Sequence, residues 1–323
     1  MKSFLRKFVL TKAMYQKLKE IRDVKRYERA SDVEKIFIDR SKHRKVLCMI
    51  LAGYKTYLYQ DVFERIIRFI PDDIDVCLVS SGLYSEDLAQ RAEKQGWSYL
   101  STKRNCVTLA QNVAIRLHDQ AEYIYKVDED IFVTQGCFET LMDTYKKVET
   151  QEEYEVGFVA PLIPINGYGH MRVLDKLGMK AVYRERFERP IYASHPDRMI
   201  ENSGEAAKFF WGEGGYIPSI DEMNQKWMAE DFQYSICPIR FSIGFVLFKR
   251  TLWENMGMFP VIEDNPCMGL DEEQICSYCI VHSKVIVVAE NTVVGHLAFG
   301  RQNEAMKEYY YQNTERFRIP VQN

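Results

Sequence analysis

From residue 46 onward, short apolar runs alternate with segments in which apolar residues recur at helical spacing. The strand-like runs are at 46–53, 74–82, 97–100 and 122–127. The helical segments between them are at 61–70, 85–96 and 105–120. Strand-like runs that alternate with helices in this way predict parallel strands joined by helical crossovers, with helices on both faces of the sheet. We therefore expect an α/β fold with a Rossmann-like, mostly parallel central sheet whose ligands gather at the carboxyl ends of its strands.

The second half of the chain is less regular. Residues 164–240 carry several Gly and Pro and show no simple periodicity, which is more typical of a substrate-binding region than of a connector. The flanking segments return to strand-like and helical patterns. We expect strands at 154–163 and 284–290, a strand followed by a helix within 241–259, a helix at 271–282, and a closing strand and turn at 291–300.

Three consecutive carboxylates, Asp128, Glu129 and Asp130, lie between the apolar runs YIYKV and IFV. Such a cluster at a sheet edge is tolerable where a cation sits among the side chains. Hard oxygen ligands suit Mg²⁺ or Mn²⁺, and His296, which follows a late strand-like run, would favour Mn²⁺ if it reached the same edge. A divalent ion there could bridge the carboxylates to a diphosphate. The alternatives are a solvated acidic loop and an ordinary core or surface histidine.

A second acidic group, in the sequence GLDEEQI (269–275), opens a predicted helix. Carboxylates in a first helical turn are common capping and dipole partners. A carboxylate at a loop-to-helix junction on the ligand-binding edge could instead act as a general base toward a hydroxyl. Both interpretations of Asp271 and Glu272 remain open from the residues alone.

Four blocks in order, at 45–54, 104–117, 126–133 and 242–296, together resemble GT-A-fold glycosyltransferases, closest to the large inverting family 2-like group. The third block, KVDEDIFV, matches the family's D-x-D block, and the last resembles its C-terminal run of strand, helix, acidic pair, helix, strand and histidine. Cys106 stands where the family usually has Gly. The acidic pair has the order Asp-Glu, which leaves open which residue is the base.

The resemblance implies a role for each matching residue. Asp130 and His296 would bind the metal, with Asp128 at the metal and near the ribose or sugar. Asp271 or Glu272 would deprotonate the acceptor hydroxyl. The residues implied to line the nucleotide are Ala52, Gly53, Arg104 and Asn105.

The implied function is metal-dependent transfer of a sugar from a nucleotide-diphosphate donor, with UDP-sugar expected from family frequency, to a glycan or glycolipid hydroxyl, with inversion, in surface polysaccharide synthesis. Trp211, in FFWGEGGYIP (209–218), is expected either to stack on the sugar or to anchor the irregular region. Two alternatives are a sugar-nucleotide nucleotidyltransferase and a non-catalytic carbohydrate-binding or scaffold protein. The loop LAGYKTYLYQ has one Gly and one Lys, which argues against the first alternative.

The charge distribution separates a basic arm from an acidic body. Residues 1–45 contain fifteen Lys and Arg against six Asp and Glu, although the whole chain of 323 residues has a formal net charge of −3. Apolar residues at helical spacing within this arm predict a basic amphipathic helix that contacts an anionic membrane surface, the protein body or, least favoured, nucleic acid.

No signal peptide or membrane span is recognisable, and the eight scattered cysteines fit reduced thiols. We therefore expect a cytoplasmic protein, peripheral at the inner face of the membrane. The predicted organisation is a basic helical arm (1–44), a nucleotide-sugar-binding subdomain (45–140), an acceptor-binding and catalytic subdomain (141–300) and a tail (301–323).

Overall fold

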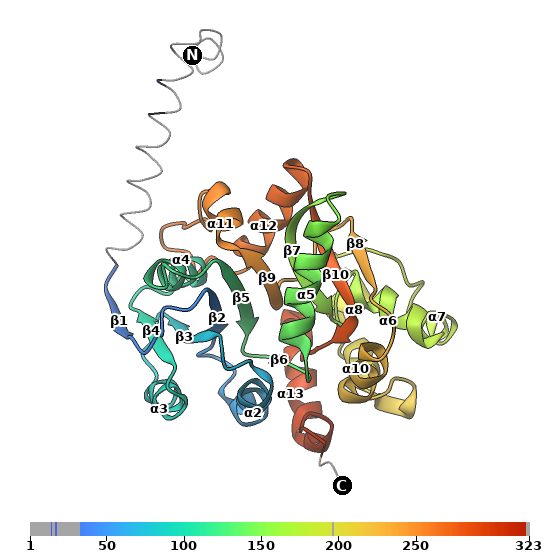
Figure 1. The fold of residues 1–323 in the computed structure, drawn as a ribbon. Coiled ribbons are helices and arrows are strands. Elements are labelled where there is room, and N and C mark those ends of the chain that lie inside the picture. The colour runs from blue at the N-terminus through green and yellow to red at the C-terminus, as the bar shows by residue number, and fades with distance from the viewer. Residues whose placement is uncertain (1–13, 15–16, 18–32, 196, 321–323) are drawn as a thin grey trace.

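The computed structural model of the chain describes residues 14, 17, 33–195 and 197–320. These residues form a nine-stranded mixed sheet covered by helices, together with a separate two-stranded sheet (Figure 1). The expected α/β class with a Rossmann-like central sheet is confirmed. In the described part of the chain, no helix has both the length and the apolar character required to cross a bilayer.

The large sheet has the strand order β1-β4-β3-β2-β5-β9-β7-β10-β8, and the small one pairs β11 with β6. Within the described residues, β2, β3, β4, β5, β7 and β10 run in one direction, and β1, β8 and β9 run in the other. The strands are β1 (Lys35–Ile38), β2 (Val46–Leu51), β3 (Asp75–Ser81), β4 (Ser98–Thr102), β5 (Tyr123–Asp128), β6 (Ile131–Phe132), β7 (Glu155–Leu162), β8 (Tyr234–Cys237), β9 (Phe245–Lys249), β10 (Lys284–Val293) and β11 (Gly295–His296).

Helices cover both faces of the sheet, with α2 and α3 on the opposite side of β2–β4 from α4 (Figure 1). The helices are α2 (Tyr59–Phe69), α3 (Glu86–Gln95), α4 (Val107–Leu117), α5 (Cys137–Thr150), α6 (Gly169–Leu177), α7 (Lys180–Arg186), α8 (Met199–Asn202), α9 (Gly204–Phe210), α10 (Ile220–Met228), α11 (Arg250–Asn255), α12 (Leu270–Val281) and α13 (Asn303–Gln312). Short 3₁₀ turns occur at η2 (Thr56–Leu58), η3 (Glu213–Gly215), η4 (Gly300–Gln302) and η5 (Thr314–Arg316).

Local sequence signals explain where helix α3 begins and ends. The Ser85 hydroxyl accepts a hydrogen bond from the backbone N–H of Leu88 at 3.3 Å and so caps the first turn. Glu86 and Asp87 lie in that turn, where carboxylates interact favourably with the helix dipole. Gly96 ends the helix in the left-handed conformation, with φ of 69°, which suits a residue without a Cβ.

Two parts of the sheet differ from the sequence-based expectation. Residues 35–38 were expected within the basic helical arm, but they form the edge strand β1, which pairs antiparallel with β4. The rest of the predicted arm helix lies almost entirely outside the described residues. Strand β9 was expected, but its antiparallel insertion between β5 and β7 was not. This insertion brings the beginning of β9, rather than its end, to the carboxyl edge of β5.

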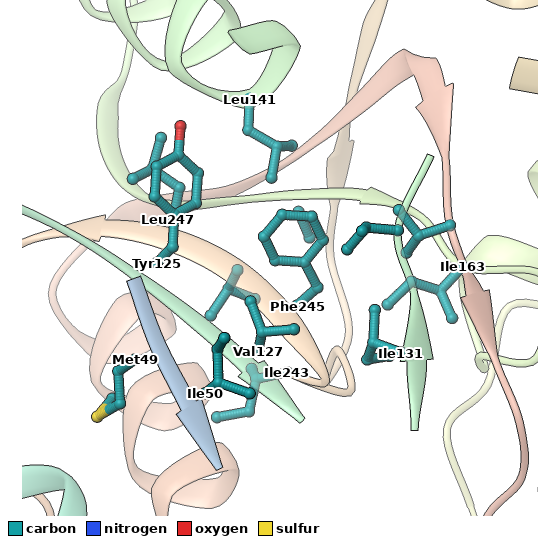
Figure 2. Packing of buried hydrophobic residues seen from close by; sticks show 14 of the residues in the cluster. Met49, Ile50, Tyr125, Val127, Ile131, Leu141, Ile163, Ile243, Phe245 and Leu247 are labelled. Carbon is teal, nitrogen blue, oxygen red and sulfur yellow. The ribbon is translucent and has the colours of Figure 1, made fainter. Parts of the chain in front are cut away.

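The hydrophobic core is continuous across this junction. Phe245, at the start of β9, lies near Tyr125 of β5, with ring centroids 6.0 Å apart, and near Phe138 of α5, at 5.1 Å. Figure 2 shows Phe245 between Leu141 of α5 and Val127 of β5. Because these side chains are fully buried, the core fixes the position of the strand ends that carry the polar residues described below.

Hydrogen bonds from the buried Arg65 hold the C-terminal segment against the rest of the fold. Arg65 of α2 is fully buried, and its guanidinium donates to both carboxylate oxygens of Asp221, at 2.9 and 2.6 Å. It also donates to the backbone carbonyls of Phe317, Val133 and Arg318. A buried guanidinium is stable where its donors are satisfied in this way. The predicted tail at 301–323 therefore includes an ordered helix, α13, and a segment packed on the body.

Residues 164–240 are more ordered than their sequence suggests, since they contain helices α6 to α10 and strand β8. His170 of α6 is 2% exposed and lies near the rings of Tyr183 and Phe210. Its Nδ1 is 2.9 Å from the carbonyl oxygen of Asn166. Burial lowers the pKa of His170 from 6.5 to about 4, because the charged imidazolium is disfavoured away from water.

We expect His170 to make the fold sensitive to acid. Below pH 6.5 the unfolded chain protonates this side chain and the folded chain does not, so stability falls until about pH 4 and then levels off. A pKa difference of this size corresponds to about 3 kcal/mol. Urea unfolding of His170→Gln at pH 7 and pH 4.5 should show a smaller loss of unfolding free energy than the wild type. The exposed His195→Gln serves as control, and an unchanged pH dependence in His170→Gln would contradict the assignment.

Candidate functional site

The candidate site lies where the parallel strands β2, β3, β4 and β5 end. The register pairs Leu51 of β2 with Asp128 of β5, so the loops that follow the two strands emerge side by side. The loop after β2 contains Gly53, and the loop after β5 contains Glu129. This is the edge at which open α/β sheets bind ligands.

Glu129 joins these two loops. Its carboxylate accepts hydrogen bonds from the backbone N–H of Gly53, at 2.8 Å, and of Tyr54, at 3.1 and 3.2 Å. Burial raises the pKa of Glu129, and the backbone donors of the loop act in the opposite direction. The middle carboxylate of the cluster therefore fixes the loop after β2 rather than facing a ligand.

The loops after β2, β3 and β4 form a cradle around Tyr54. The Tyr54 hydroxyl donates to the carbonyl of Ser81 at 2.6 Å and lies 3.2 Å from Oδ1 of Asn105, while the residue is 60% exposed. Gly82 has φ of 79°, and a Cβ there would lie 2.4 Å from the Cβ of Asn105, so only Gly permits this approach. Ala52, which precedes Gly53 in the same loop, is buried.

Asp130 contacts two basic side chains from distant parts of the chain. Its Oδ2 lies 2.5 Å from Nζ of Lys55 and 3.3 Å from Nε2 of His296. The pairing of β6 with β11 places His296 opposite Ile131, and the N–H of Leu297 donates to the carbonyl of Asp130. Burial opposes ionisation of Asp130, but His296 and Lys55 hold its pKa well below the usual range.

Lys126 of β5 forms a second charged group. Its Nζ is 2.7 Å from Oδ1 and 2.8 Å from Oδ2 of Asp128, 3.8 Å from Oδ2 of Asp271, and donates to the carbonyl of Ile243 at 2.9 Å. Gln111 of α4 also donates to Asp271, at 2.8 Å. Burial and the negative charges of Asp130 and Asp271 raise the pKa of Asp128 to about 6. The positive charge of Lys126 acts in the opposite direction.

Glu272 has different partners from its neighbour Asp271. It accepts hydrogen bonds from the guanidinium of Arg240 and from the backbone N–H of Ile243, the latter at 3.3 Å. The Arg240 side chain is 52% exposed, whereas that of Glu272 is 11% exposed. Glu201 of α8 lies in the same electrostatic neighbourhood, and burial, with the charge of Glu272, raises its pKa. Within the described residues, Oε1 of Glu201 is buried without a hydrogen-bond partner.

The structure thus brings the predicted site residues to the carboxyl edge of the sheet, and Trp211 is the exception. Trp211 is 6% exposed, packs on Phe132 and Phe317 with centroids 5.3 and 4.4 Å away, and donates to the carbonyl of His296 at 3.1 Å. A ring buried in this way cannot stack on a sugar, so the expected stacking role is corrected. Trp211 instead supports the strand that carries His296, where a Cβ on Gly295 would collide with the indole.

The predicted metal ligands do not form a three-residue set. Asp130 and His296 meet, and Nδ1 of His296 is buried without a partner in the described structure, but Asp128 is directed to Lys126. In the described part of the chain, no group of three or more His, Cys, Asp or Glu side chains is arranged to hold an ion. The side chains as placed do not fit the expected Mn²⁺ or Mg²⁺ site, because Lys55 already presents a positive charge to Asp130.

Sequence reasoning did not assign Lys55, Lys126 or Arg240 to the site. Lys126 stands in an otherwise apolar strand, where an isolated lysine is costly unless it is paired, and this was an available signal. Lys55 and Arg240 had no such signal, because Lys55 lies in a polar loop and Arg240 reaches the site through the antiparallel insertion of β9.

A search of solved structures finds the mannosyltransferase PcManGT from Pyrobaculum calidifontis, determined in complex with GDP-Man and Mn²⁺. The match covers 91% of this chain and 72% of that chain, with 14% sequence identity and a TM-score of 0.46. No protein-family model and no curated protein matches the chain. At this identity and TM-score the likeness supports no conclusion about substrate or reaction, so these are argued from the site.

We expect Lys126 to be essential for stability. Lys126→Met would leave the buried Asp271 and the partly exposed Asp128 without their shared cation, and breaking a buried pair costs about 3–5 kcal/mol. Guanidinium unfolding measures this loss, and Lys45→Met is the matched control because Lys45 forms an exposed pair with Glu122. The double variant Lys126→Met/Asp128→Asn should recover part of the loss. A loss below 1 kcal/mol for Lys126→Met would show that the charges do not depend on one another.

Proposed function

We propose that this chain is a glycosyltransferase of the GT-A type that transfers a sugar from a nucleoside-diphosphate donor to a hydroxyl of a glycan or glycolipid. The observation that carries this proposal is the meeting of two acidic segments at Lys126, namely Asp128 after β5 and Asp271 at the start of α12. Both lie beside the cradle at the carboxyl edge of the sheet. The proposed nucleotide subsite and the acidic pair that contains the proposed base would then share one edge of the sheet, which supports sugar transfer.

The cradle provides the nucleotide subsite. The exposed ring of Tyr54 offers an aromatic face to a nucleobase, and Gly53 allows close approach of a ribose. Asn105 lies within reach of the same space, next to Arg104, whose guanidinium donates to the carbonyl of Ile262. A donor bound here would direct its diphosphate toward Asp128 and Asp130. We expect the nucleotide to be UDP, because the sequence resembles family 2-like enzymes.

Glu272 is the proposed general base. Asp271 is enclosed by the buried donors Gln111 and Lys126, so it positions the neighbouring groups, whereas Glu272 faces the exposed Arg240. The acceptor hydroxyl transfers its proton to Glu272 while its oxygen bonds to the anomeric carbon. The bond from that carbon to the phosphate oxygen breaks, and the nucleoside diphosphate leaves with the electron pair. Attack from the face opposite the diphosphate inverts the anomeric configuration.

A divalent ion, where one binds, would neutralise the departing diphosphate as a Lewis acid. The resemblance assigns this ion to Asp130 and His296, but Lys55 already lies beside Asp130. Since the side chains do not present a complete ligand set, no step above depends on the ion. The expected contact of the basic arm with an anionic membrane concerns residues outside the described structure and stays a prediction of the sequence.

A thermal-shift panel tests the donor class. Uridine, guanosine and cytidine diphosphates should raise the melting temperature, one of them most, because a ligand that binds only the folded state stabilises it by mass action. The corresponding triphosphates and free sugars are measured alongside. A shift with triphosphates alone would favour the nucleotidyltransferase alternative, and a shift with free sugars alone would favour a carbohydrate-binding protein.

Paired variants of the acidic segment test the base. Glu272→Gln should lower the rate of transfer about a hundredfold or more, the range typical of a general base, while the affinity for the nucleoside diphosphate stays within about twofold. Asp271→Asn, in contrast, should weaken donor binding and transfer together, because it disturbs the Lys126 group. Full turnover by Glu272→Gln, measured in the presence of saturating donor and acceptor, would place the base elsewhere.

A further inference from the structure

The positive charge beside Asp130 is the ammonium of Lys55, a residue of this chain. Lys55 follows Gly53 and Tyr54 in the loop after β2, and its ammonium lies 2.5 Å from Oδ2 of Asp130 and 3.2 Å from Oδ1 of Asn303. The Lys55 side chain is 24% exposed and that of Asp130 is 7% exposed. The Lys55 side chain is therefore partly open to solvent, whereas the carboxylate that it contacts is buried.

The position of this ammonium is fixed from several directions. Glu129 holds the backbone of the loop through the N–H groups of Gly53 and Tyr54, so Lys55 starts from a defined point. Asn303, at the start of α13, restrains the end of the side chain. An ammonium has three N–H donors, and in the described part of the chain these two acceptors leave one of them for a ligand.

The other carboxylate of the D-x-D block has its own lysine. Both oxygens of Asp128 are within 2.8 Å of Lys126, which is 4% exposed and cannot leave without unpairing Asp271 as well. Asp128 is thus committed to a protein cation. The two carboxylates expected to share one divalent ion are instead paired with two separate lysines.

We infer that Lys55 is the diphosphate-binding cation of this site and that donor binding does not require a divalent metal ion. This inference rests on the proposed function, because it concerns the diphosphate of the proposed donor. The Lys55 ammonium keeps its bonds to Asp130 and Asn303 and donates its third hydrogen to a phosphate oxygen next to the cradle. A charge-assisted bond of this kind is stronger than a neutral one and stabilises the negative charge on the leaving diphosphate.

Calorimetric titration with UDP, GDP and inorganic pyrophosphate tests the inference, each measured in EDTA and again in MnCl₂. Pyrophosphate is included because its binding does not depend on the nucleobase. The wild type should bind in EDTA with an affinity within about twofold of that in MnCl₂. Lys55→Met should weaken binding about tenfold or more in both buffers, which corresponds to the loss of at least 1.4 kcal/mol.

Two further variants separate the role of Lys55 from a general loss of positive charge. Lys103→Met removes a lysine at the same sheet edge, where Lys103 pairs with the exposed Glu34, and should bind like the wild type. Lys55→Arg keeps the charge and should retain most of the affinity. Melting temperatures without ligand show whether each variant is folded, and the wild-type comparison of EDTA with MnCl₂ needs no variant.

The outcomes separate this inference from the proposed function. Binding of a nucleoside diphosphate only in MnCl₂, with Lys55→Met equal to or tighter than the wild type, would overturn the role of Lys55 and leave the transferase proposal standing. Binding in EDTA that is unaffected by Lys55→Met would likewise assign the diphosphate to another cation. The absence of binding to all three probes, with and without Mn²⁺, would overturn the inference and the proposed function together.

Discussion

The arrangement of the site depends on one buried lysine. Lys126 projects from a strand whose other side chains are largely apolar, and its ammonium joins Asp128, Asp271 and the carbonyl of Ile243. These three partners come from the end of β5, the start of α12 and the approach to β9. A buried charge is tolerated only with such compensation, so the chain can bury Lys126 only by bringing all three segments together. The geometry of the acidic edge follows from this requirement.

The same constraint explains the separation of roles among the five carboxylates. Glu129 holds the loop after β2 through backbone N–H groups, and Asp128 and Asp271 share Lys126. Two carboxylates have partners nearer to solvent: Asp130, beside Lys55, and Glu272, beside Arg240. We propose that Asp130 faces the leaving diphosphate and that Glu272 faces the acceptor hydroxyl. The Asp128 side chain, although it is paired with the buried Lys126, is 32% exposed.

Much of the half of the sheet formed by β2 to β5 could be predicted from the sequence. Its strands and helices follow one another in parallel crossovers, so the periodicity of residues 46–127 and the position of Asp128 were sufficient to place the acidic cluster at the carboxyl edge. The sequence pattern suggested that His296 could reach the same edge, and the resemblance paired it with Asp130, but the contact itself depends on the short pairing of β6 with β11. The role of Trp211 was not predictable, since a Gly-rich context fits an exposed ring and a buried anchor equally well.

The lysines were missed for a physical reason. Sequence patterns show which residue types occur near a strand end, but the partner of a long side chain is set by tertiary packing. Lys55 could have pointed to solvent, and the antiparallel insertion of β9, which brings Arg240 to Glu272, leaves no local signature. A carboxylate cluster read without its lysines predicts a metal ion, whereas the same cluster with its lysines already carries the compensating charge.

The most direct measurement of the central claim is a crystal structure of the full chain grown with UDP in the presence of EDTA. The account predicts density for the uracil against Tyr54, with the diphosphate between Lys55 and Asp128 and a β-phosphate oxygen within hydrogen-bond distance of the Lys55 ammonium. Nucleotide bound away from the ends of β2 and β5 would contradict the account. So would the absence of nucleotide density at the acidic edge in crystals grown at saturating UDP.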